Sequence, residues 1–146
     1  MIFQYRIELL VNLNIFLQSF FRPKPKSIFG IHDSAGVRAL FQLRLGLSPL
    51  RSHKQNHNSV DTPSAICSCN QGIEDTYHYL FTCPFYTEHR NILVSAVSDV
   101  LQKHNLVFPE YKSDLYLYGH PLINDPDNKA IILSTIIYIK KTNCSS

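Results

Sequence analysis

The sequence predicts a mainly α-helical fold, a small helical domain with a zinc knuckle inserted between its helices. Two observations favour it. Apolar residues recur at spacings of three and four in several segments, and three of the four cysteines lie within seventeen positions that also hold a histidine. With 146 residues, 45% of them hydrophobic, the chain can bury a core of its own. Its five scattered glycines form no phosphate-binding loop, which excludes the usual nucleotide hydrolases.

The chain begins with an apolar segment, residues 1–21, which we expect to be a helix that packs or seeks a partner. Arg6 and Glu8 interrupt it, and no small-residue cleavage site follows it. Two alternatives stay open for this segment: a membrane or targeting element, and a translated stretch that is unrelated to the rest of the chain. Residues 22–32 are predicted to be a Pro/Lys linker, because each proline disfavours helical geometry in the residue before it.

Residues 33–140 form the predicted helical zinc-binding domain, followed by a tail at 141–146. Its first helix is expected over residues 35–45, with Asp33-Ser34 as the cap and Gly46 as the stop. The predicted apolar face of this helix consists of Val37, Leu40, Phe41 and Leu45. Residues 48–64 lack apolar periodicity and read as a loop with a short helical turn.

Two longer helices are expected after the cysteines. One begins at Pro84 and reaches about His104, since proline is favoured in a first turn. Its predicted apolar face consists of Ile92, Leu93, Ala96, Val97, Val100 and Leu101. The last helix is expected to have Asp125 as its cap and Pro126 in its first turn. Its predicted buried side consists of Ile131, Ile132, Thr135, Ile136 and Ile139. Residues 107–118 fit either a helical turn or a short strand.

Cys67, Cys69, His78 and Cys83 follow the pattern C-x-C-x8-H-x4-C. Three thiolates and one imidazole complete the tetrahedral set of a structural zinc site, so zinc is the predicted cofactor. Gly72 permits a chain reversal after the first pair, and Asp75 or Thr76 caps a short helix that carries His78. Buried free cysteines with an ordinary hydrogen-bonded histidine are the alternative, and Arg90 or Lys54 is expected to lie near the site.

Charge is unevenly distributed along the chain. The formal net charge is +3, but residues 22–57 hold seven Lys/Arg and a single acid, Asp33. A basic segment of this kind can contact phosphate groups. His53 and His57, four residues apart, are simpler to explain as part of this basic surface than as a second metal site.

Several segments together resemble one family. They are Phe21-Arg22-Pro23-Lys24-Pro25, Phe29-Gly30-Ile31-His32-Asp33, Gln42-Leu43-Arg44-Leu45-Gly46-Leu47-Ser48-Pro49-Leu50, His53-Lys54, His57-Asn58, Cys67-Ser68-Cys69, Gly72-Ile73-Glu74-Asp75-Thr76-Tyr77-His78-Tyr79, Cys83-Pro84 and Leu117-Tyr118-Gly119. In combination they resemble the C-terminal region of animal non-LTR (LINE-type) retrotransposon reverse transcriptases, including the cysteine-histidine motif after the polymerase domain. The resemblance covers roughly residues 21–140 and identifies the chain as a truncated fragment.

The resemblance implies a non-catalytic zinc-binding module that contacts RNA or DNA, because the chain has no Asp-Asp pair for a polymerase site. It assigns metal binding to Cys67, Cys69, His78 and Cys83, and nucleic-acid binding to the adjoining residues Arg38, Arg44, Arg51 and Lys54. The alternatives are a structural or protein-interaction remnant and an enzyme tail that needs a polymerase domain in trans. We expect no membrane association and a nuclear or cytoplasmic location, while the oligomeric state stays open.

Overall fold

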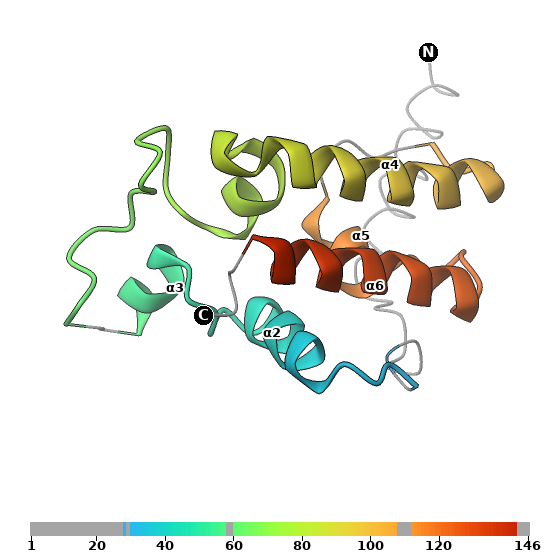
Figure 1. Cartoon of the computed structure of the whole chain (residues 1–146), viewed down its shortest axis with the longest axis horizontal. Helices are drawn as coiled ribbons and strands as arrows, with labels where there is room; N and C mark the ends of the chain where they lie inside the picture. The colour runs from blue at the N-terminus through green and yellow to red at the C-terminus, as the bar shows by residue number, and fades with distance from the viewer. Residues whose placement is uncertain (1–27, 29, 58–59, 108–111, 143–146) are drawn as a thin grey trace, which may run out of the picture.

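The computed structural model describes residues 28, 30–57, 60–107 and 112–142 (Figure 1). The helical elements in this part of the chain are α2 (Ser34–Arg44), α3 (Arg51–Asn56), the π-turn η2 (His78–Thr82), the 3-10 turn η3 (Pro84–Tyr86), α4 (Thr87–Lys103), α5 (Ser113–Tyr118) and α6 (Asp125–Lys141). The described residues form no strand, only an isolated antiparallel bridge between Ile66 and Ile73. The predicted mainly helical fold is therefore confirmed.

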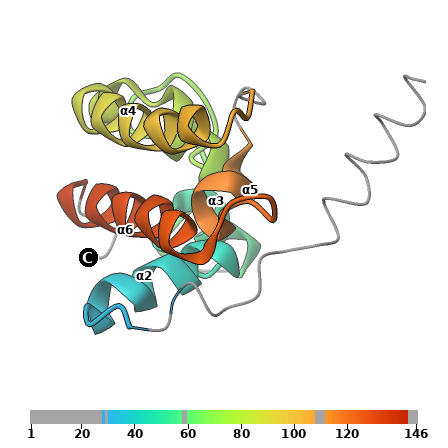
Figure 2. The ribbon, with the colours of Figure 1, turned by 90° about the vertical axis from the view of Figure 1, so that its right-hand side faces the viewer.

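Helix α6 lies in the middle of the fold. Figure 2 shows α4 on one side of it and α2 on the other, Figure 1 shows α5 behind it, and all three helices contact α6. Pro126 occupies the first turn, but the cap is Asn124 rather than Asp125, because the Asn124 side chain accepts a hydrogen bond from the Asp127 amide (2.9 Å). The predicted side of α6 is buried throughout, as expected for its central position.

Helix α2 begins where the sequence places it but packs through a different face. Asp33 Oδ1 accepts from the Gly36 amide (2.9 Å) and caps the helix. The residues it buries are Gly36, Ala39, Leu40 and Leu43. Phe41 and Leu45 are exposed, so the predicted face was wrong for them. A Cβ at Gly36 would lie 2.4 Å from Ile136 Cγ2, which shows that α2 approaches α6 through its small residues.

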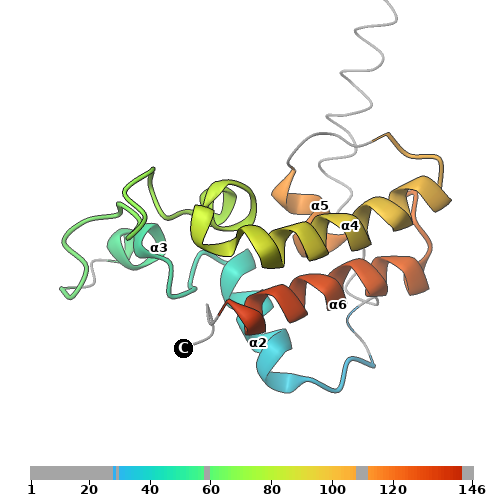
Figure 3. The same ribbon diagram turned by 45° about the horizontal axis from the view of Figure 1, so that its top comes forward.

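The remaining elements settle several expectations. η3 provides the proline-led start before α4, which buries Leu93, Val97 and Leu101, whereas Ile92 is 68% exposed. Residues 113–118 form a helix rather than a strand, and the loop after α2 contains α3 as its short helical turn. The antiparallel run of α4 beside α6, clear in Figures 1 and 3, supplies eight of the nineteen buried residues of the core.

The predicted apolar segment 1–21 lies outside the described residues, as do Cys144 and most of the linker. Near the end of the linker, Ile28 and Ile31 pack against the core, and the Gly30 carbonyl accepts from Lys129 (3.2 Å). Lys141, the first residue of the predicted tail, still belongs to α6. None of the helices within the described ranges combines the length and apolar composition needed to cross a bilayer.

Candidate metal centre

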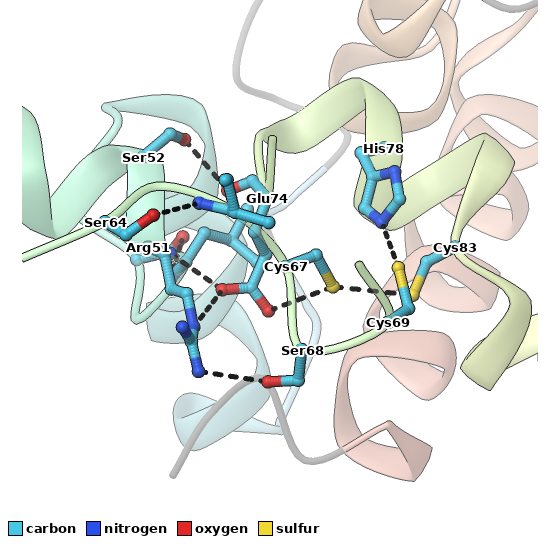
Figure 4. Close-up of polar contacts among 12 residues, drawn as sticks. Arg51, Ser52, Ser64, Cys67, Ser68, Cys69, Glu74, His78 and Cys83 are labelled. Atoms are coloured by element: carbon cyan, nitrogen blue, oxygen red, sulfur yellow. Dashed lines mark hydrogen bonds and ion pairs between the residues drawn. The ribbon is translucent and has the colours of Figure 1, made fainter. Parts of the chain in front are cut away.

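The four predicted ligands converge between α3 and α4. Cys67 and Cys69 come from the loop before η2, His78 opens η2, and Cys83 follows it (Figure 4). One donor atom from each residue lies within 4.8 Å of the other three. These residues could therefore bind a metal ion.

Two of the donor distances can be compared with those of a tetrahedral site. Metal–sulfur bonds of ~2.3 Å and a metal–nitrogen bond of ~2.0 Å place two sulfurs ~3.8 Å apart and a sulfur and a nitrogen ~3.5 Å apart. Cys67 Sγ and Cys83 Sγ are 3.8 Å apart, and Cys69 Sγ and His78 Nε2 are 3.2 Å apart. The donors thus fit one tetrahedral ion with shifts of a few tenths of an ångström at these two edges.

A tight loop presents the first two cysteines. The Cys67 amide donates to the Gly72 carbonyl (2.8 Å), and the Asn70 amide donates to the Cys67 carbonyl (2.9 Å). Asn70 adopts a left-handed conformation with φ of 58°, which asparagine tolerates better than most residues. The bridge between Ile66 and Ile73 closes the base of this loop, so both cysteines lie within the closed segment.

The spacing between His78 and Cys83 explains why a π-turn lies here. In an α-helix, with 3.6 residues per turn, residues five apart point about 140° away from each other. The Cys83 amide instead donates to the His78 carbonyl (2.8 Å), and this wider turn brings residue 83 back over residue 78. Cys83 is extended because Pro84 follows it, and its thiol faces the cluster.

Hydrogen bonds orient the His78 ring. Asp75 Oδ1 accepts from the His78 amide (2.8 Å), so Asp75, one of the two predicted candidates, caps this turn. Thr82 Oγ1 lies 2.9 Å from His78 Nδ1. When Nδ1 donates its proton to Thr82, Nε2 is left with a free lone pair facing Cys69, which is the tautomer a metal requires.

Burial controls the protonation of the thiols. It raises the pKa of Cys67 to about 12 and also raises the pKa of Cys83. Desolvation acts in the same direction on Cys69, but the backbone hydrogen bond from Gln71 and the neighbouring thiols lower the pKa of Cys69. An incoming cation must therefore displace protons from at least the two buried sulfurs, so metal binding releases protons and weakens as the pH falls.

Three polar side chains lie near the cluster, and the sequence predicted only Arg90 among them. Glu74 Oε1 lies 3.9 Å from Cys67 Sγ, and the Arg51 guanidinium donates to Ser68 Oγ (3.0 Å) between the two cysteines. Arg90, expected near the site, donates to the Leu80 carbonyl (3.0 Å) and to the Cys83 carbonyl, so it holds the backbone around Cys83. No periodicity or spacing marks these contacts in the sequence.

The predicted nucleic-acid residues lie on two different helices and divide into two pairs. Arg38 on α2 and Lys54 on α3 are exposed. Arg44 donates to the Leu117 carbonyl (2.8 Å) and lies over the Tyr118 ring, 4.6 Å from its centroid. Arg51 donates to Ser68, in the loop that carries Cys67 and Cys69. Two of the four cations thus have partners within the protein.

Fold and site together define a small helical domain with a Cys3His cluster that could bind a metal ion. Comparison of the chain with protein-family models, with curated proteins and with solved structures gave no match.

Proposed function

We propose that the Cys3His cluster holds a structural zinc ion in a non-catalytic module. The convergence of its four donor atoms carries this proposal. Three thiolates and one imidazole favour zinc over the harder divalent cations, and a complete protein ligand set leaves no position for a reacting water. Cys67, His78 and Cys83 are only 2%, 6% and 0% exposed, as suits a closed structural site.

Elemental analysis of the purified protein tests the zinc site. We expect one zinc per chain, lost in the Cys67→Ser/Cys83→Ser double variant and retained in Cys144→Ser, which changes a cysteine outside the predicted ligand set. A wild-type protein that folds without zinc, and takes up none when zinc is added, would overturn the proposal.

We further propose that this module contacts RNA or DNA and derives from the tail of a non-LTR retrotransposon reverse transcriptase. The exposed cations Arg38 and Lys54 support phosphate contact, and the segments quoted above support the ancestry. A polymerase domain acting in trans is the expected partner of such a tail. A nuclear or cytoplasmic location agrees with the zinc site and with this ancestry, since reduced thiols are stable in those compartments.

Anisotropy titrations with single-stranded RNA and duplex DNA of mixed sequence test this contact. Each neutralised phosphate adds about 0.7 to 0.9 to the slope of log affinity against log salt. Loss of two cations in Arg38→Ala/Lys54→Ala should therefore lower that slope by about 1.4 to 1.8. The control is Lys112→Ala, an exposed lysine outside the α2–α3 segment. Binding that neither salt nor the double variant changes would refute the proposal.

A second candidate, a protein-interaction module, is favoured by an apolar groove between α4 and α6. Its volume is about 330 Å³, and its lining includes Ile92 and Ile137, which are 68% and 55% exposed. A second copy of the chain could cover these side chains. Sedimentation equilibrium should then show a dimer that persists at high salt and is lost in Ile137→Glu. A monomer at all concentrations would exclude this candidate.

A further inference from the structure

The residues of helix α3 themselves contribute little to its stability. It spans only six residues, none of them buried, and its N-cap Leu50 offers no side-chain hydrogen bond. Helices this short do not persist in water on their own, because the first turn is costly to form. The contacts that stabilise α3 must therefore come from elsewhere in the chain.

Glu74 supplies the missing cap. Its Oε2 accepts from the Arg51 amide (2.9 Å), and its backbone carbonyl accepts from the Ser52 amide (3.3 Å) and from the Ser52 hydroxyl (2.9 Å). Two of the unpaired amides at the start of α3 are thus satisfied by one residue that lies 23 and 22 positions further along the chain.

Glu74 itself is part of the metal-binding loop. Its amide donates to the Ala65 carbonyl (2.8 Å), beside the bridge that closes the loop, and its Oε1 lies 3.9 Å from Cys67 Sγ (Figure 4). Its Oε2 also lies 3.8 Å from the Arg51 Nε, whose guanidinium reaches Ser68. The start of α3 is therefore attached to the loop that carries the first two ligands.

A second attachment leads to the other ligand arm. His53 Nε2 lies 3.4 Å from Thr76 Oγ1, two residues before His78, and His53 Nδ1 lies 2.7 Å from Ser48 Oγ. A metal ion bound by all four ligands would fix both arms relative to each other. Without it, the two arms are held together by the backbone and by the weaker contacts of Cys67 with Cys83 and of Cys69 with His78.

We propose that Glu74 is a positioning residue that makes the formation of α3 depend on the bound metal. This rests on the zinc site proposed above. Metal binding fixes the loop, the loop places Glu74, and Glu74 caps α3, which carries the exposed Lys54. The basic surface of the module is then complete only in the metal-bound protein.

Hydrogen exchange measured by NMR on the full chain tests this order of events. With zinc bound, the Arg51 and Ser52 amides should exchange slowly. A chelator should accelerate them about tenfold or more, while the Ile132 and Ile136 amides in the core stay protected. Glu74→Ala should keep its zinc yet show the same fast exchange, and Glu74→Gln, whose amide oxygen can still accept, should restore part of the protection. Asp61→Ala removes an exposed acid nearby and serves as the control.

The outcomes separate this proposal from the zinc site itself. A chain that takes up no zinc contradicts both. Zinc binding with α3 amides that are equally protected before and after chelation, or unaffected in Glu74→Ala, contradicts the positioning role alone. Loss of zinc from both Glu74 variants contradicts it as well, because Glu74 would then act on the metal rather than between the metal and α3.

Discussion

Replacement of Gly119 by alanine should destabilise the fold far more than an ordinary glycine substitution. Gly119 ends α5 with φ of 80° and ψ of −162°, a conformation that side chains rarely adopt. A Cβ there would lie 2.3 Å from Asn128 Oδ1. Asn128, 2% exposed, accepts from the His120 amide (2.8 Å) and donates to the His120 and Ile123 carbonyls (3.0 and 2.9 Å).

The size of the effect follows from these contacts. The strained backbone costs about 1 to 3 kcal/mol. Asn128 must also move, which weakens three hydrogen bonds, one buried and two partly buried, each worth about 1 kcal/mol when intact, at a cost of about 2 kcal/mol in all. The expected loss is about 3 to 5 kcal/mol, a large part of the stability of a typical domain. Gly46→Ala is the matched control: φ is 68°, but the nearest atom to its Cβ is 3.9 Å away. It should cost about 1 to 2 kcal/mol.

Urea unfolding followed by far-ultraviolet circular dichroism measures both losses, with zinc at the same excess in every sample. The double variant Gly119→Ala/Asn128→Ala should lose less than the sum of the two single changes, because alanine at 128 removes the atom that clashes. Equal midpoints for Gly119→Ala and Gly46→Ala, or fully additive losses, would show that Asn128 does not hold this loop as inferred.

Three further outcomes are expected. Cys83→Ser should lower the thermal midpoint of the whole domain, since Tyr79, Leu80 and Phe81 of the same turn are at most 6% exposed in the core; an unchanged midpoint in calorimetry would contradict this. Arg44→Ala should cost about 1 to 3 kcal/mol in urea unfolding, because it removes a charged hydrogen bond and a ring contact, whereas Arg38→Ala should cost under about 0.5 kcal/mol; equal losses would refute the distinction. Hydrogen bonds from Lys103 and His104 lower the pKa of Asp127 below 3.8, so its stabilising contribution is present above about pH 4 and is lost as the pH falls through the lowered pKa. The difference in urea midpoint between wild type and Asp127→Asn should thus shrink from pH 6 to pH 3, and a constant difference would contradict this.

Local spacing was enough to predict which four residues could bind a metal ion, and to predict α6. A C-x-C pair and an H-x4-C pair each converge through a single turn, and the isoleucines of α6 are so numerous that its buried side is clear. The π-turn that brings Cys83 back to His78 was not predicted, because propensity describes α-helices and the wider turn arises from the ligands and the core residues between them.

The packing of α2 shows why its buried face was missed. A search for large apolar residues selects Phe41 and Leu45, but the approach to Ile136 requires a residue without a side chain, and Gly36 meets that need. Once Gly36 faces α6, Ala39, Leu40 and Leu43 follow on the same side by helical geometry. Which face is buried thus depends on a partner helix 100 residues away, which is beyond the reach of a local pattern.

The same reasoning changes how the charge of the basic segment is understood. A count of lysines and arginines treats every cation as available to phosphate. Arg44 instead donates to the Leu117 carbonyl of α5, and Arg51 donates to Ser68 in the loop between Cys67 and Cys69. Removing either would loosen the fold, so a lower affinity for RNA or DNA in those variants would not show that they touch a phosphate. Arg38 and Lys54 are exposed, and only a loss in their variants, with an unchanged unfolding midpoint, distinguishes contact with a ligand from support of the structure.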